Sequence, residues 1–154
     1  MQEWYRSRSL YEAVLKLIQA GNYDEAVNMA RAIPDKVVRS KAMSRIALEL
    51  ARKGGDYRDA LELAIKSALD IETEAESTKA LMSLAFEFLN MGDTDEALKI
   101  AEYMRDLSNK SKIQAEVAMV LARSGRVSEA MNLIEGIIDD DVKTWAMSRL
   151  ASQL

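Results

Sequence analysis

The sequence of 154 residues contains neither cysteine nor histidine. Without cysteine the chain has no disulfide bond, no zinc–thiolate site and no cysteine nucleophile. Without histidine it lacks the commonest general base and the commonest ligand of transition metals. An active site would have to be built from aspartate, glutamate, lysine, tyrosine or serine alone. We therefore expect a protein that is not an enzyme and that holds no metal ion or other cofactor.

Residues that interrupt helices are also scarce, since the chain has six glycines and a single proline, Pro34. The rest of the composition, with 49% apolar and 30% charged residues, is ordinary for a soluble globular protein. So few helix-breaking residues in a chain of this length favour helices over strands. The length fits one domain.

Signals for a membrane or for export are missing as well. No stretch approaches the roughly 18 uninterrupted apolar residues of a membrane-spanning helix. Residues 1–8 contain no apolar segment of the kind found in secretory signals. The net charge of −4 favours solubility and disfavours the phosphate backbone of a nucleic acid as a partner. We expect a cytoplasmic protein that binds neither membranes nor nucleic acid.

A short pattern, a glycine followed five residues later by an alanine, occurs four times. The copies begin at Gly21, Gly55, Gly92 and Gly125, which are 34, 37 and 33 residues apart. Glycine suits the left-handed conformation that ends a helix, and the acidic residues after most of these glycines suit the first turn of the next helix. Each copy therefore predicts a tight turn between two helices.

The segments around these turns predict about nine helices, arranged as four hairpins and one last helix. The first helix of each unit is expected at residues 3–20, 38–53, 75–91, 110–124 and 142–154. The second helix of each hairpin is expected at residues 23–33, 57–71, 94–107 and 127–138. Because no linker interrupts them, we expect one all-α domain over residues 1–154, with the last helix as a cap. The alternative is that this last helix docks against a second copy of the chain through Trp145 and Met147.

The spacing of apolar residues indicates which helix faces are buried. In the first helices these residues recur at i, i+3, i+4 and i+7, which places them on one face. They are Met43, Ile46, Ala47 and Leu50; Leu81, Leu84, Ala85 and Phe88; and Met147, Leu150, Ala151 and Leu154. In the second helices, pairs one turn apart let two helices approach closely: Ala26 and Ala30, Ala60 and Ala64, Ala97 and Ala101, and Ala130 and Ile134. We interpret both sets as core packing between stacked hairpins.

With these features the chain resembles the tetratricopeptide repeat (TPR) family. The resemblance rests on the spacing near 34 residues, on the alanine five residues after each glycine, and on Ala85 and Ala118 seven residues before two of them. The chain departs from the family where alanine replaces a large aromatic residue of the second helix, and Pro34 falls earlier than the family's closing proline. The resemblance implies a right-handed α-solenoid of antiparallel helix–turn–helix repeats, whose concave groove binds peptides.

A further face of the first helices is the candidate binding surface. By unit, its positions are Arg8, Tyr11 and Leu15; Lys41, Ser44 and Leu48; Lys79, Met82 and Phe86; Lys112, Ala115 and Met119; and Trp145, Ser148 and Ser152. A basic residue opens four of these five rows, and an apolar residue lies deeper in the same four. In a TPR-like solenoid this face lines the groove.

We expect the partner-binding residues among these positions to be Arg8, Tyr11, Lys41, Ser44, Leu48, Lys79, Phe86, Lys112, Met119 and Trp145. A groove with a basic rim and an apolar floor would suit an acidic, amphipathic peptide. The alternative interpretation separates the two features. The lysines are then solvated side chains beside the helix caps Ser40, Thr78 and Ser111, and the apolar residues pack neighbouring hairpins together.

Acidic clusters offer little sign of a metal site. The run at residues 139–141 is better explained as the cap of the helix that follows it. We expect a protein-interaction module, a scaffold or adaptor that binds a peptide or a partner helix. The alternatives are a helical repeat that binds nucleic acid, since pentatricopeptide arrays have a similar period and read RNA, and a structural module that associates with itself, including a homodimer through the last helix.

Overall fold

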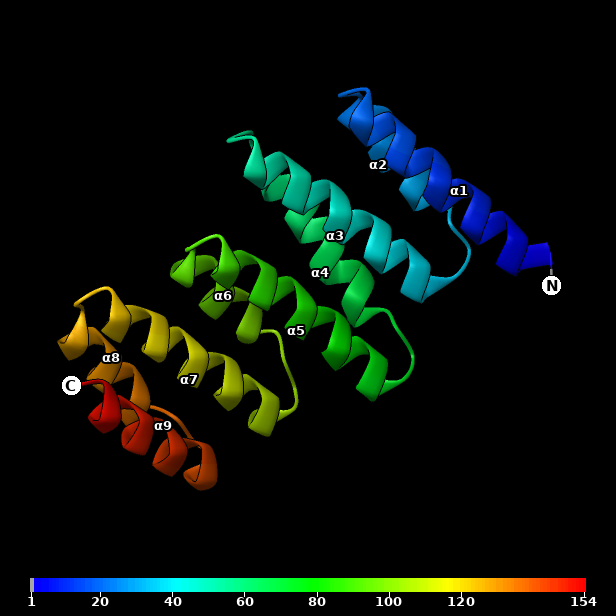
Figure 1. The fold of residues 1–154 in the computed structure, drawn as a ribbon. Helices are drawn as coiled ribbons and strands as arrows, with labels where there is room; N and C mark the ends of the chain where they lie inside the picture. The colour runs from blue at the N-terminus through cyan, green and yellow to red at the C-terminus, as the bar shows by residue number, and fades with distance from the viewer. Residues whose placement is uncertain (1) are drawn as a thin grey trace. The chain divides into compact units, whose positions relative to one another are not determined.

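The computed structural model describes residues 2–154, and over these residues it consists of nine α-helices without any strand (Figure 1). Helices make up 79% of the chain, well above the third or so that is usual in globular proteins. The predicted all-α class is confirmed. No helix in the described part of the chain is both long and apolar enough to cross a membrane.

The helix bounds follow the predicted ones closely. They are α1 (Gln2–Gln19), α2 (Tyr23–Arg31), α3 (Lys36–Arg52), α4 (Arg58–Leu69), α5 (Glu74–Asn90), α6 (Thr94–Ala101), α7 (Leu107–Arg123), α8 (Val127–Glu135) and α9 (Asp140–Gln153). Every predicted end lies within three residues of the observed one except the end of α6, which was expected at residue 107 and occurs at Ala101.

The segment predicted as the last part of α6 contains the cap of the next helix. Asp106 has extended backbone angles, and its carboxylate accepts hydrogen bonds from the backbone N–H groups of Ser108 (3.0 Å) and Asn109 (3.3 Å). A residue that caps α7 in this way cannot also continue α6. The connecting segment is held down by Met104, which is buried.

Aspartates, rather than serines, cap the first helices. Asp35, Asp106 and Asp139 each accept a hydrogen bond from a backbone N–H in the first turn of α3, α7 and α9. The expected caps Ser40, Thr78 and Ser111 are wrong, because all three lie inside their helices, and both serines are buried. Helices α3 and α7 begin two or three residues earlier than predicted, so the lysine that follows each serine lies in the second turn.

The turns between paired helices follow the predicted glycine pattern with one exception. Gly21, Gly92 and Gly125 have φ between 76° and 84°, and the residue after each donates its N–H to a carbonyl five residues earlier, as in a Schellman motif. In the second turn the residue with positive φ (73°) is Gly54, and Gly55 is the residue that donates to Leu50. The prediction of Gly55 at this place is therefore wrong by one position.

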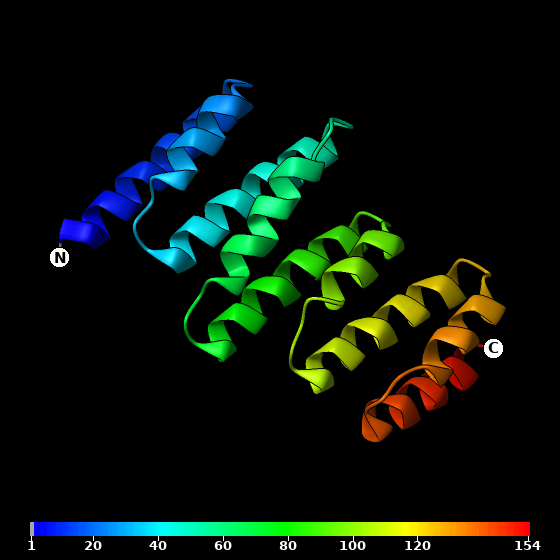
Figure 2. The ribbon, with the colours of Figure 1, turned by 180° about the vertical axis from the view of Figure 1, so that it is seen from behind.

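The chain divides into two compact units, residues 1–80 and residues 81–154. In unit 1, α1 pairs with α2 and α3 pairs with α4, and α3 also packs against α1 and α2 (Figure 1). In unit 2, α7 pairs with α8 and packs against α6, while α9 packs against α7 and α8 (Figure 2). In each unit, both helices of one hairpin therefore contact the helix that begins the next repeat. This helix is α3 in unit 1 and α9 in unit 2.

A hydroxyl group joins successive hairpins at the same place in both units. In unit 1 the Oγ of Ser7 on α1 accepts a hydrogen bond from the backbone N–H of Asp35, at 3.1 Å. In unit 2 the Oγ of Ser111 on α7 accepts one from the N–H of Asp139, at 3.4 Å. Both serines are buried, and both bonds span 28 residues to the cap of the next first helix. The same contact recurs within the two units.

The predicted core faces are buried, apart from four residues. All four residue pairs in the second helices and the face from Leu81 to Phe88 are buried. Leu50 and Met147 are half-buried, Ala151 on α9 is exposed, and so is Leu154, the residue that follows this helix. Leu154 keeps 81% of its side-chain surface accessible, because no further element covers this end of α9 in the described chain. The last helix is anchored instead by Ala146 and Leu150.

Candidate functional site

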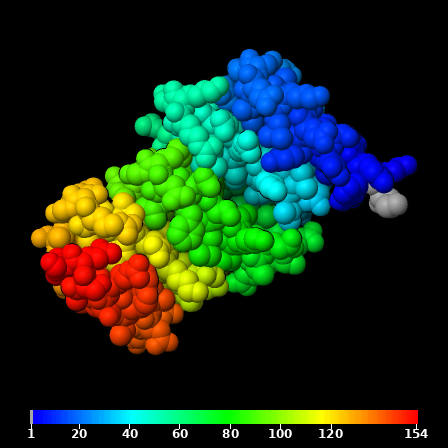
Figure 3. Space-filling view, in the orientation of Figure 1, coloured from blue at the N-terminus to red at the C-terminus, as the bar shows by residue number. Residues whose placement is uncertain are grey.

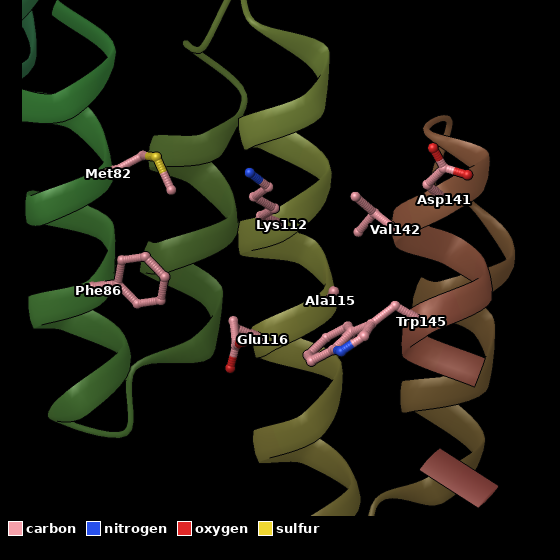
Figure 4. Close-up of a pocket in the computed structure, with 8 residues that line it drawn as sticks. All are labelled: Met82, Phe86, Lys112, Ala115, Glu116, Asp141, Val142 and Trp145. Carbon is pink, nitrogen blue, oxygen red and sulfur yellow. The ribbon is translucent and has the colours of Figure 1, made fainter. Parts of the chain in front are cut away.

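An open pocket of about 420 Å³ lies on unit 2, between α5, α7 and α9 (Figure 4). It is lined by Met82, Phe86, Lys112, Ala115, Glu116, Asp141, Val142 and Trp145. All three helices are the first helices of their repeats, and only the part of α5 that belongs to unit 2 contributes. In the space-filling view the surface of α9 is open to the solvent on this side of the unit (Figure 3).

Helical spacing brings these side chains to one place. On α5, Met82 and Phe86 are four residues apart, so they lie about one helical turn apart on the same face. On α7, residues 112, 115 and 116 share a face in the same way, as do residues 141, 142 and 145 on α9. Each of the three helices thus contributes residues from one of its faces to the pocket.

The walls of the pocket are mostly apolar. Met82, Phe86 and Val142 are half-buried, and Ala115 at the base is fully buried. Trp145 is the most exposed apolar residue of the lining, with 43% of its surface accessible. Arg149, one turn further along α9, places its guanidinium 5.8 Å from the centre of the Trp145 ring. The indole is therefore ordered at one edge of an apolar surface that solvent reaches.

Three charged side chains complete the lining. Lys112 and Asp141 are exposed, and Glu116 is half-buried. None of the three forms an ion pair or a hydrogen bond through its side chain within residues 2–154. Two carboxylates and one ammonium therefore face the solvent at the pocket without partners inside the protein.

The pocket brings together three of the predicted binding residues, Phe86, Lys112 and Trp145. Met82 and Ala115, which belong to the same predicted face, line it too. Met119 does not, because it is 1% exposed and packs into the core of unit 2. For Met119 the structure supports the alternative interpretation, in which the deeper apolar residue of the row joins neighbouring helices.

The remaining predicted residues lie in unit 1. Arg8 and Tyr11 are on α1; Lys41, Ser44 and Leu48 are on α3; and Lys79 is on α5. The lysines are exposed, Tyr11 and Ser44 are half-buried, and Leu48 is buried, with 7% of its surface accessible. Arg8 is held within its own helix, 3.8 Å from Glu12 and over the ring of Trp4. Of these six, Leu48 is too buried to contact a ligand on this surface.

Three lining residues were not predicted as part of the site, namely Glu116, Asp141 and Val142. Glu116 lies four residues after Lys112, and the other two lie four and three residues before Trp145. Extending the predicted face by one helical turn would have found all three. Asp141 was predicted to belong to a cap, but the capping carboxylate is that of Asp139, which accepts from the N–H of Val142 at 3.0 Å. Asp141 is thereby left to face the pocket.

Within the described chain no group of three acidic side chains is placed to hold a metal ion. Neither carboxylate at the pocket is hydrogen-bonded to another side chain of the described chain. Apolar walls with a few separate charges are typical of a pocket that binds a ligand.

The chain matches no protein-family model, no curated protein and no solved structure. The resemblance to the TPR family therefore stays a prediction that rests on the residues quoted for it. Fold alone does not identify a partner, so the function has to be argued from the pocket and its charges.

Proposed function

We propose that the chain is a non-catalytic protein-interaction module, a scaffold or adaptor built as a TPR-like α-solenoid. It binds a peptide or a helix of a partner protein through the face that the first helices present. The observation that carries this proposal is the open apolar pocket between α5, α7 and α9, with an exposed tryptophan in its lining.

The stacking of hairpins is supported by the repetition seen within the units. In unit 1 and again in unit 2, a first helix packs on the first helix of the next hairpin. The hydrogen bonds from the N–H groups of Asp35 and Asp139 to buried serines occupy corresponding places. Repeats that contact only their neighbours and share one interface form a solenoid when the interface is propagated.

The binding role is supported by the composition of the pocket. Tryptophan is among the residues that contribute most binding energy at protein interfaces, and methionine adapts to partners of different shape. Trp145 and Met82 contribute these two side chains next to Phe86 and Val142. A cavity of about 420 Å³ falls in the range of sites that receive small groups, so it can hold one or two side chains of a partner.

The alternative that this chain binds nucleic acid is disfavoured by charge. Residues 81–154 carry twelve acidic and eight basic side chains. A surface that binds phosphates needs an excess of lysine and arginine. At the pocket, Lys112 is accompanied by two carboxylates, so this face would repel a phosphate backbone.

Capture of partners from an extract of the native source tests the proposal. The variant combines Trp145→Gln with Met82→Gln and removes apolar surface from the pocket. The control combines Tyr103→Gln with Leu107→Gln, which are 49% and 52% exposed on the same unit and do not line the pocket. Circular dichroism of both variants should match the parent, since exposed and half-buried positions contribute little to folding.

We expect one or more proteins to be captured by the parent and by the control but lost from the pocket variant. Loss from both variants would mean that the interaction depends on another surface. An identical set of captured proteins for all three would contradict the assignment of this pocket as the binding site.

A further inference from the structure

The charges around the pocket indicate what kind of segment it binds, an inference that rests on the proposed function. Glu116 on α7 and Asp141 on α9 line the pocket from different helices. In the close-up, Val142 and Trp145 lie between these two carboxylates (Figure 4). The apolar surface formed by Val142 and Trp145 is therefore flanked by an acidic group on each side, while Met82 and Phe86 lie beyond Glu116.

Lys112 does not balance these two carboxylates. It lies four residues before Glu116 on the same helix, a spacing at which opposite charges attract each other on a helix surface. Even if the two groups compensate one another in solution, the carboxylate of Asp141 is left without a partner in the described chain. The lining carries a formal charge of −1.

The surrounding unit has the same sign. Residues 1–80 carry thirteen acidic and thirteen basic side chains and are formally neutral, whereas residues 81–154 account for the whole net charge of −4. A charge of this kind attracts a basic partner and repels an acidic one, and the effect is strongest at low ionic strength. The negative charge of the pocket lining and that of residues 81–154 thus both favour a basic partner.

We infer that the pocket binds an apolar side chain of a partner segment that carries basic residues on both sides of that side chain. The apolar side chain packs against Val142 and Trp145, and the flanking ammonium or guanidinium groups face Glu116 and Asp141. Charge complementarity of this kind sets orientation and speeds association more than it adds affinity. The inference replaces the acidic partner expected from the basic rows, of which only Lys112 reaches this pocket.

Three blocked pentapeptides serve as probes. The first has the sequence Lys-Gly-Leu-Gly-Lys, the second replaces both lysines by glutamate, and the third replaces the leucine by glycine. Binding is followed in nitrogen–proton correlation spectra through the indole N–H signals. The chain has two tryptophans, Trp4 and Trp145, and Trp145→Phe identifies which signal belongs to the pocket.

We expect the lysine–leucine peptide to shift the indole signal of Trp145 and to leave that of Trp4 unchanged. The glutamate peptide and the peptide without leucine should each bind more weakly. Glu116→Gln and Asp141→Asn should each weaken binding of the lysine peptide by about two- to five-fold at low salt, as expected for solvent-exposed charge pairs. Asp140→Asn is the matched control, since Asp140 is exposed and does not line the pocket, and it should change the affinity less than Asp141→Asn does.

The possible failures are distinguishable. A glutamate peptide that binds as tightly as the lysine peptide, or tighter, would overturn the inference about charge and leave the interaction pocket in place. Equal affinities for the Asp140→Asn and Asp141→Asn variants would also overturn it. If none of the peptides moves the Trp145 signal at millimolar concentration, the inference falls, while the capture experiment still tests the proposed function by itself.

Discussion

Glycine at a single position decides each turn between paired helices. Gly21, Gly54, Gly92 and Gly125 all have positive φ, and a Cβ atom added at any of them would meet no atom within 4 Å. Their requirement for glycine is therefore conformational and not a matter of space. The sequence pattern located three of the four, and it misplaced the second because two glycines are adjacent there.

Alanine substitutions at these two adjacent glycines should have different effects. Gly54→Ala should lower the free energy of unfolding by about 1–2 kcal/mol, because a side chain is strained in the left-handed region. Gly55→Ala should change it by no more than about 0.5 kcal/mol, since its φ is not positive and its Cβ would lie 3.4 Å from Leu50. Urea unfolding followed by circular dichroism measures both. Equal losses would show that the turn does not depend on the position of the left-handed residue.

Small residues decide how closely the second helices approach. Ala97 on α6 is fully buried, so a larger side chain has no room unless the helices separate. Ala97→Leu should destabilise the chain by about 1–3 kcal/mol through overpacking. Lys99→Gln on the same helix is exposed and should stay within about 0.5 kcal/mol of the parent. A leucine variant as stable as the parent would mean that position 97 does not face a neighbouring helix.

The ion pair at the start of α8 gives a prediction about pKa. Arg126 donates a hydrogen bond from its Nε to Glu129 at 3.0 Å, and this bond with the nearby positive charge lowers the pKa of the Glu129 carboxyl. Arg126→Gln should raise that pKa toward its ordinary value. A depressed pKa stabilises the fold above the ordinary value and loses its effect as the pH falls through the lowered one, but for this exposed pair the effect is small. Carboxyl chemical shifts measured across pH provide the test, and an unchanged Glu129 titration would contradict the pairing.

At the scale of whole helices, the repeated sequence pattern predicted the hairpins because each turn has a local signal. The end of α6 was missed because residues 102–105 contain neither glycine nor proline, and only Asp106 marks the break. Helix starts were placed late because an aspartate several residues upstream, and not the serine beside the lysine, caps the helix. Such competition between possible caps is decided by tertiary contacts, as in the burial of Ser111 against the next hairpin.

The three aspartates at the start of α9 have different roles. Asp139 caps the helix, whereas Asp141 lines the pocket. Asp139→Ala should cost about 1 kcal/mol, because it removes the acceptor for the N–H of Val142. Asp140→Ala should cost only about 0.3 kcal/mol, the contribution of an exposed charge to the helix dipole. Asp141→Asn should leave stability nearly unchanged and affect ligand binding. Thermal unfolding of the three variants measures the order, and a larger loss for Asp140 than for Asp139 would contradict the assigned cap.

At the scale of the molecule, the candidate site could be predicted only in part. The face predicted on α5, α7 and α9 contains five of the residues that line the pocket, since helical periodicity fixes which residues share a face. It did not show that Met119 and Leu48 would be buried while Trp145 stays exposed, because burial depends on how closely neighbouring helices pack. Nor did it show that Glu116 and Asp141 would meet at one pocket, since they belong to different repeats.

The exposed end of α9 leads to a prediction about association. Trp145 and Leu154 are exposed on this helix, but the neighbouring exposed residues Ser148, Arg149 and Ser152 are polar, so the apolar surface is interrupted. Sedimentation equilibrium should therefore give the mass of a single chain at all concentrations, with α9 acting as a cap. A dimer that Trp145→Glu dissociates would contradict this and place the self-association at α9.

The most direct test of the central claim is a photo-crosslinking measurement at the pocket. A photoreactive phenylalanine analogue replaces Val142, which lines the pocket, or Tyr103, which lies outside it on the same unit. Each protein is irradiated in an extract of the native source, and covalent adducts are identified by mass spectrometry. We predict an adduct with a specific protein from position 142 and none with that protein from position 103. The same adducts from both positions, or no adduct from position 142, would contradict the claim that this pocket binds a protein partner.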